Sequence, residues 1–424
     1  MSLGGRLLCT GVQFSLALTL SLCVQAQQGQ PPEPTIPEIT VKVNEVIVPV
    51  VVRNAQGESV GTLTKEDFQV FDGGNLQTLT GFSVTERTGE SNPAVAPAPA
   101  NNGSPVAPQP PSQAERSVVF VFDDLNMSSS ELTQAKRAAS KLFETSLPAS
   151  DMAAVASTSG SNTGLMRDHT KLQQAIRNLK LQTTYQSNPL DCPNIDYYQA
   201  DLILNKGDSA ALAAAISDAM ICAGLPDGAA HEAVAAQSAQ QAAHRAVDMG
   251  ERDFRTNLKF LRLVISTMGD LPGQRILIFI SPGFLTFSEE AMELKSQLLE
   301  IASQANVTIN AIDVRGLYTT DLEATNAGGN PGATANKTVY RQKSASLKEN
   351  VMAELTQGTG GSYFHNSNAL ASGLNSLSSG PKYLYFLTFS IDKEKLNGMY
   401  HSLKIKVKPK ALTVEARSGY VAGR

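Results

Sequence analysis

Carboxylate, amide and hydroxyl side chains follow one another in the stretch "VVFVFDDLNMSSSELTQAK", residues 118–136. Five apolar residues lead directly into Asp123 and Asp124, and Asn126 and Ser128 come next at alternate positions. Oxygens of these kinds are the ligands that a hard cation such as Mg²⁺ takes in proteins. The apolar run has the character of a strand that is buried on both faces. The stretch therefore predicts a divalent-cation site at the end of a buried strand.

The same residues are also compatible with an ordinary helix start. Ser128, Ser129 or Ser130 would cap the helix that is predicted to follow, because a serine oxygen accepts a free backbone N–H of the first turn. Glu131 would lie in that first turn, where a negative charge suits the helix dipole. In this interpretation the two aspartates are solvated residues at a sheet edge. The residue types alone allow both interpretations.

Strands and helices alternate along the chain from residue 116 onward. Continuous apolar runs recur in "QRILIFISPGF" (274–284) and "VTINAIDVRG" (307–316). Segments with helical periodicity separate these runs, as in "SSSELTQAKRAASKLFETSL" (128–147). Repeated alternation of this kind predicts the α/β class. We expect a doubly wound, mostly parallel, Rossmann-like sheet over residues 116–380, with an insertion at 185–228.

The first residues have the pattern of a secretory signal peptide over residues 1–26. Arg6 supplies a small positive region, an apolar run follows at Phe14–Val24, and small residues precede Gln27. A membrane anchor is the alternative. We expect an exported chain, periplasmic or extracellular, without a membrane span once the signal is removed.

Two proline-rich segments and two β-rich segments flank the predicted α/β domain. The leader at 27–37 and the Pro/Ala/Gly-rich linker at 87–115 lack a core-forming pattern. Residues 38–86 and 381–422 read as short strands, and neither segment offers enough strands to be stable alone. We predict that the two segments pair to form a small β domain.

Only two cysteines remain after the signal peptide, Cys192 and Cys222, and both lie in the insertion. An even pair in an oxidising compartment predicts a disulfide.

Composition argues against two classes of function. The formal net charge is −4 and basic runs are absent, so nucleic acid is not expected as a partner. The five histidines are scattered, and "SPGF" does not match the Gly-x-Ser-x-Gly nucleophile elbow. The glycines of "TQGTGGSY" lack the Lys-Ser/Thr ending of a P-loop and predict a helix end. We therefore do not expect an enzyme. The alternative is an exported hydrolase that uses the loops at the C-terminal edge of the sheet.

Several motifs in a fixed order resemble the von Willebrand factor type A-related proteins of the acidobacterial type. They are "VIVPVVVRNAQGESVGTLTKEDFQVFDGG", "DDLNMS", "LIFISPGF", "ELTQGTGGSYF" and "VEARSGYVA", and together they cover residues 38–422. The resemblance implies a type A-like fold and a protein-binding or adhesion function, with a protein partner that the sequence does not identify. It also implies a divalent cation at a metal-ion-dependent adhesion site.

The resemblance assigns the metal ligands by position. Asp124, Asn126 and Ser128 fall on the family's Asp-x-Ser-x-Ser spacing, with Asn in place of the first Ser. A threonine from a later loop is expected as a further ligand, and Thr184, or its neighbour Thr183, takes that place.

One segment departs from the family pattern. Where the family has Thr-Asp-Gly after a later strand, this chain has Ser281-Pro282-Gly283. Pro282 cannot bind a cation through its side chain, so a degenerate site with weak affinity for Mg²⁺ is expected. Asp123 is the candidate that replaces the missing carboxylate.

Overall fold

The computed structural model of the 424-residue chain describes residues 45–54, 58–86, 116–148, 150–182, 192–317, 331–391 and 400–421. The predicted signal peptide (1–26), leader (27–37) and linker (87–115) lie outside these ranges. In the described part of the chain, no helix combines the length and the apolar character needed to cross a membrane.

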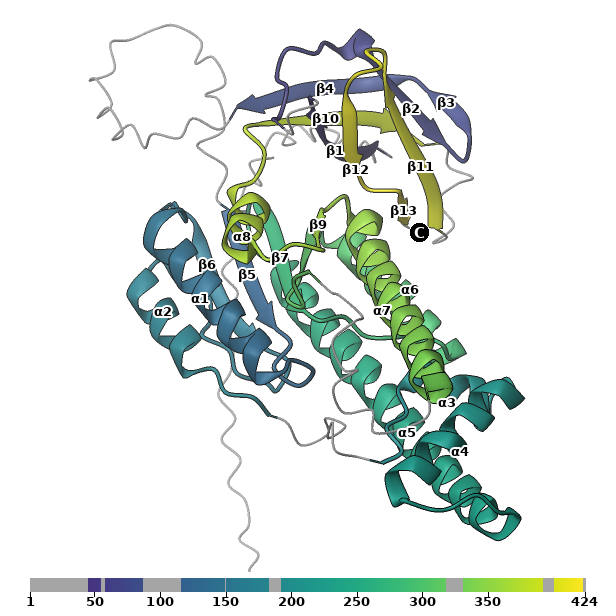
Figure 1. The fold of residues 1–424 in the computed structure, drawn as a ribbon. Coiled ribbons are helices and arrows are strands. Elements are labelled where there is room, and N and C mark those ends of the chain that lie inside the picture. The colour runs from purple at the N-terminus through teal and green to yellow at the C-terminus, as the bar shows by residue number, and fades with distance from the viewer. Residues whose placement is uncertain are drawn as a thin grey trace, which may run out of the picture. The chain divides into compact units, whose positions relative to one another are not determined.

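A five-stranded parallel sheet with helices on both faces confirms the predicted α/β class with a Rossmann-like arrangement (Figure 1). The strand order is β6-β5-β7-β8-β9, and each neighbouring pair is parallel. The strands are β5 (Arg116–Phe122), β6 (Met152–Ser157), β7 (Gln274–Ser281), β8 (Val307–Asp313) and β9 (Tyr363–Phe364). All seven residues of β5 are buried, as the continuous apolar run predicts.

Alternate residues of β5 belong to two separate cores, because successive side chains of a strand point to opposite faces. Phe120 and Phe122 pack with the helices of one face, and Val119 and Val121 pack with those of the other. The first face carries α1 (Ser129–Thr145), α2 (His169–Asn178) and α8 (Leu370–Ser379). The second carries α5 (Ala229–Met268), α6 (Glu289–Gln304) and α7 (Pro331–Thr359).

The direction of winding reverses at β5. The chain passes from β5 to β6 on one side, and β7 then pairs with the opposite side of β5. In open α/β sheets, ligands bind at such a reversal, in the crevice outside the carboxyl ends of the two strands. In this chain the corresponding position lies after Phe122 of β5 and Ser281 of β7.

Strands from the two β-rich segments form two four-stranded sheets, of order β12-β1-β10-β4 and β13-β11-β2-β3. The segment near the N-terminus gives β1 (Glu45–Arg53), β2 (Phe68–Asp72), β3 (Asn75–Gln77) and β4 (Leu79–Glu86). The later segment gives β10 (Tyr383–Ser390), β11 (Tyr400–Val407), β12 (Thr413–Ala416) and β13 (Gly419–Val421). Within the first sheet, β1 lies between β10 and β12 and is antiparallel to both. That these sheets form a domain of their own stays a prediction.

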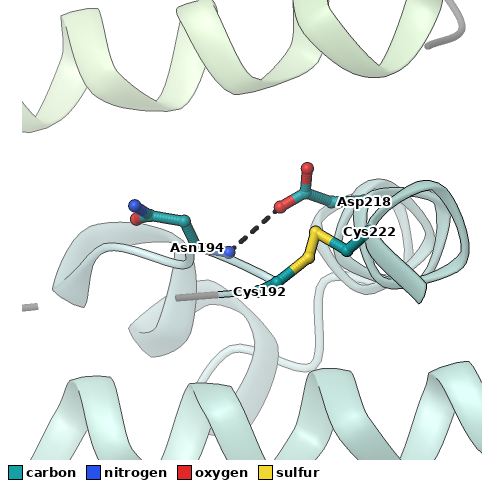
Figure 2. Close-up of a disulfide and its surroundings, with 4 residues drawn as sticks. All are labelled: Cys192, Asn194, Asp218 and Cys222. Atoms are coloured by element: carbon teal, nitrogen blue, oxygen red, sulfur yellow. Dashed lines mark hydrogen bonds between the residues drawn. A yellow bond between two sulfur atoms is a disulfide. The ribbon is translucent and has the colours of Figure 1, made fainter. Parts of the chain in front are cut away.

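Within the insertion, α3 (Tyr197–Leu204) and α4 (Ser209–Ala223) pack against the first half of α5 through a core rich in alanine. A disulfide joins Cys192, which precedes α3, to Cys222 near the end of α4, as predicted (Figure 2). The two Cα atoms are 5.7 Å apart. Close by, the Asn194 backbone N–H donates to Asp218 at 3.1 Å.

The disulfide is expected to hold α3 and α4 together. Its sequence separation of 30 residues corresponds to a loop-closure contribution of about 3–4 kcal/mol. We predict that the double variant Cys192→Ser/Cys222→Ser exchanges the amide hydrogens of α3 and α4 much faster, whereas those of β5 and β7 keep their protection. Hydrogen exchange with mass spectrometry checks this, and equal exchange in the two proteins would contradict it.

Candidate functional site

Three neighbouring strands bring polar side chains to the same edge of the parallel sheet. Phe122, the last residue of β5, is in register with Ser157 of β6 and with Ile280 of β7. The next residue of each strand therefore meets its neighbours at the carboxyl edge. These residues are Asp123, Thr158 and Ser281.

Asp123 is fully buried and accepts hydrogen bonds from four side chains. The Ser281 hydroxyl donates to Oδ2 at 2.7 Å, and the Asn257 amide of α5 donates to the same oxygen at 3.4 Å. The Asn126 amide donates to Oδ1 at 3.0 Å, and the Thr158 hydroxyl does so at 3.2 Å. Asp123 therefore ties the ends of β5, β6 and β7 to α5.

Asp124 is also buried, but its carboxylate contacts a different segment. The backbone N–H of Ser159 donates to Oδ1 at 2.9 Å, and the Ser159 hydroxyl donates to Oδ2 at 2.5 Å. The Thr158 hydroxyl also contacts Oδ1, at 3.1 Å. Because neighbouring residues of an extended chain point to opposite sides, Asp123 lies on the α5 face and Asp124 lies on the α2 face.

The two carboxylates share one donor, the hydroxyl of Thr158. A hydroxyl carries a single proton, so it cannot fully satisfy two ionised carboxylates at once. Burial raises the pKa of Asp123 from 3.8 to about 6, and the charge of Asp124 contributes to the rise. Ser281, Asn126 and Thr158 oppose this shift by donating to the charged form.

Ser128 forms the helix cap of the second interpretation, but the solvated aspartates of that interpretation are wrong, because both carboxylates are buried. Its hydroxyl accepts the backbone N–H of Glu131 at 3.3 Å, and the Glu131 carboxylate accepts the backbone N–H of Ser128 at 2.7 Å. This reciprocal pair is a capping box at the start of α1.

Of the predicted metal ligands, Asn126 contacts Asp123 directly, Asp123 and Asp124 are joined through Thr158, and Ser128 caps α1. Asn126 and Ser128 line one cavity and Asp124 lines another. Both oxygens of Asp124 already accept hydrogen bonds, and the Ser128 hydroxyl is used by the helix cap. Thr184, like Thr183, lies outside the described residues. Within the described ranges, no three His, Cys, Asp or Glu side chains gather in a way that could hold a metal ion.

These contacts do not fit a cation site that is ready for an ion. A cation bound by Asp124 would first have to displace the donors of Thr158 and Ser159. Mg²⁺ also needs near-octahedral geometry and one or two carboxylates that are free to bind it.

A cavity of about 330 Å³ occupies the crevice at the reversal of winding. The segment after β5 contributes Asn126 and Ser128, and the segment after β7 contributes the backbone around Gly283. Gly283 has φ +83°, and a Cβ there would lie 3.0 Å from Cβ of Lys348, so a side chain is unfavourable at this position. Glu131 of α1 and Asp196, the N-cap of α3, also line the cavity. The rest of the wall comes from α3, α5 and α7 and includes Tyr197, Asp253, Ser344 and Lys348.

The cavity wall contains ionisable groups whose pKa values are shifted by burial. Burial raises the pKa of Asp196, and it raises the pKa of Asp253 to about 7 with a contribution from Asp123. Burial, with Arg315 nearby, lowers the pKa of Lys348 against the opposing charges of Asp196 and Asp253. Perturbed groups of this kind, grouped in one cavity, mark a candidate functional site.

The pKa of Asp253 leads to a prediction about pH and stability. The folded chain keeps this proton between about pH 4 and about pH 7, where the unfolded chain has already lost it, so this residue's contribution to stability falls as the pH rises. Asp253→Asn has no such proton. From about pH 5 to about pH 8 the wild type is expected to lose this contribution and the variant is not. The difference in free energy of unfolding between them should therefore shift by about 1–3 kcal/mol in favour of the variant.

Urea unfolding at the two pH values measures the difference. Asp248→Asn, an exposed change on the same helix, serves as the matched variant and is expected to show no such gain. If both variants respond equally to pH, the effect does not come from Asp253.

Several residues of this site were not found by sequence reasoning. Thr158 and Ser159 follow β6 in a hydroxyl-rich turn, "STSGSNTG" (157–164), and that composition was a usable signal. Asn257 and Lys348 lie within long helices, where a single polar residue gives no signal of its own.

The sequence was also compared with known proteins. Neither the scan against protein-family models nor the search of curated proteins gave a match.

Proposed function

We propose that this chain is an exported binding module of the von Willebrand factor type A-related kind, which holds a protein partner at the carboxyl edge of its parallel sheet. The observation that carries the proposal is the polar cavity between the ends of β5 and β7. It lies where open α/β folds bind their ligands. The motif order of residues 38–422 supports the type A assignment.

The buried network beneath the cavity gives this surface a fixed geometry. Asp123 connects the ends of three strands with α5, and the capping box fixes the start of α1. Binding surfaces whose side chains are held in place before contact lose less entropy when they bind. We propose that the partner is held by the polar groups around Asn126, Tyr197 and Ser344, without a bridging cation.

A photo-crosslinking experiment tests the location of the partner. Tyr197 is replaced by benzoylphenylalanine, which keeps an aromatic ring at the cavity wall, and the protein is exposed to the exported protein fraction of its native cell. We expect a defined adduct that forms equally with and without a chelator. The matched control carries the same group at Tyr400, which is 57% exposed on β11, and is expected to give no such adduct.

Two outcomes would contradict the proposal. Adducts at position 400 without adducts at position 197 would place the interaction surface elsewhere. Loss of the adduct in chelator, restored by added Mg²⁺, would show that a cation displaces the hydrogen bonds of Asp124 and takes part in binding.

A further inference from the structure

A groove of about 600 Å³ lies along α1, reaches Arg177 of α2, and shares no lining residue with the cavity at the sheet edge. The two helices lie side by side on one face of the parallel sheet (Figure 1). Four basic side chains line the groove, against the single carboxylate of Glu144. They are Lys136, Arg137, Lys141 and Arg177.

One of the four basic groups has a structural role. The Lys136 ammonium donates to the carbonyl oxygens of Arg177 at 2.6 Å and of Leu179 at 2.8 Å, which ties α1 to the end of α2. The other three, Arg137, Lys141 and Arg177, are exposed. In the described part of the chain, these three make no ion pair with a carboxylate.

The charge of the groove is opposite in sign to the net charge of the chain. The formal net charge is −4, yet the groove carries an excess of positive charge. A local excess of one sign attracts partners of the other sign and orients them during approach. The groove is therefore suited to an anionic partner.

The spacing of the charges indicates what kind of anion fits. Arg137 and Lys141 are four residues apart on one helix face, so their side chains begin about 6 Å from each other. Alternate side chains of an extended peptide are about 6.4–6.8 Å apart. The alkyl stems of the basic residues also give the groove an apolar floor for a peptide chain. We propose that this groove binds an extended acidic protein segment with carboxylates at alternate residues.

This inference does not depend on the proposed function, because it concerns a different surface. The probe is a fluorescein-labelled peptide of about ten residues in which glutamate and serine alternate, and its binding to the full chain is followed by fluorescence anisotropy at low salt. A peptide of the same composition with its glutamates in one block tests the spacing. Since exposed charges are screened within about 10 Å at 0.1 M salt, binding is expected to weaken as salt is added.

Matched charge-reversal variants locate the site. Arg137→Glu/Lys141→Glu/Arg177→Glu is expected to weaken binding of the alternating peptide at least about tenfold, which corresponds to about 1.4 kcal/mol. The control reverses three exposed lysines on other elements, which changes the net charge equally and is expected to alter binding less than about twofold. That control is Lys206→Glu/Lys404→Glu/Lys410→Glu. If the charge reversal disturbs folding, Arg137→Gln/Lys141→Gln/Arg177→Gln replaces it. This milder variant is also expected to weaken binding of the alternating peptide.

Four outcomes would overturn the inference. They are the absence of binding by the wild type, equal loss in the control variant, equal affinity for the block peptide, and stronger binding of an acidic polysaccharide such as polygalacturonate at equal charge. The last result would assign the groove to a polymer of sugar acids.

Discussion

Asp123→Ala is expected to lower the free energy of unfolding by about 3–5 kcal/mol, because each buried donor left without its acceptor costs about 1–3 kcal/mol. The change removes the common acceptor of four side chains in a fully buried position. The donors of Ser281 and Asn257 would then be buried without their partner, and a small cavity would remain. Calorimetry is expected to record a melting temperature that is lower by roughly 5–15 °C.

Asp270→Ala is the matched control, because Asp270 is exposed in the turn after α5, and a change within about 0.5 kcal/mol is expected there. Ser281→Ala and Thr158→Val each remove one donor and should cost about 1–2 kcal/mol. A loss below about 1 kcal/mol for Asp123→Ala would mean that these hydrogen bonds contribute little to the folded state.

Asp151→Ala is expected to have an effect of similar size at the opposite end of the sheet. Arg116 starts β5, and its guanidinium lies 2.6 Å from Asp151, with side-chain exposures of 5% and 6%. Arg116 also donates to the carbonyl oxygen of Ser378. Removing the carboxylate leaves a buried cation without its opposite charge, which costs about 3–5 kcal/mol.

The double variant Arg116→Met/Asp151→Ala is expected to recover most of that loss, because a buried ion pair can often be replaced by apolar groups at little cost. Urea unfolding of the two single variants and the double variant gives the coupling energy. The more exposed pair of Arg255 and Glu290, at 35% and 47%, is the control, and Glu290→Ala should cost less than about 1 kcal/mol. A double variant as unstable as Asp151→Ala would contradict the argument.

The parallel sheet could be predicted because its signal is local. Strands buried on both faces need continuous apolar runs, and those of β5 and β7 stand out in the sequence. The carboxylates at the end of β5 were found for the same reason, since they directly follow one of these runs. The disulfide could be predicted by counting cysteines, because only Cys192 and Cys222 lie outside the predicted signal peptide.

The arrangement of the site could not be predicted from local sequence. Asp123 and Asp124 are neighbours with the same chemistry, and only the register of β5 decides which of them faces α5. A spacing such as Asp-x-Asn-x-Ser suggests that the three side chains converge on one ion. It does not reveal that Thr158 and Ser159 already donate hydrogen bonds to the Asp124 carboxylate. Contacts from helices distant in sequence depend on tertiary packing. The position of Thr184 stays a prediction.

The pairing of β1 with β10 and β12 has a consequence for the order in which the chain folds. Arg53 at the end of β1 contacts Glu415 of β12 across 362 residues of sequence. Among the described residues, β1 has only short local contacts near its end, to Ser59 and Val60, and both of its long partner strands come late in the chain. Contacts so distant in sequence slow folding. Until they form, the unpaired edges of a strand can pair with other chains and aggregate. The interval between synthesis and closure of this sheet is therefore the period in which the chain most needs protection from other chains.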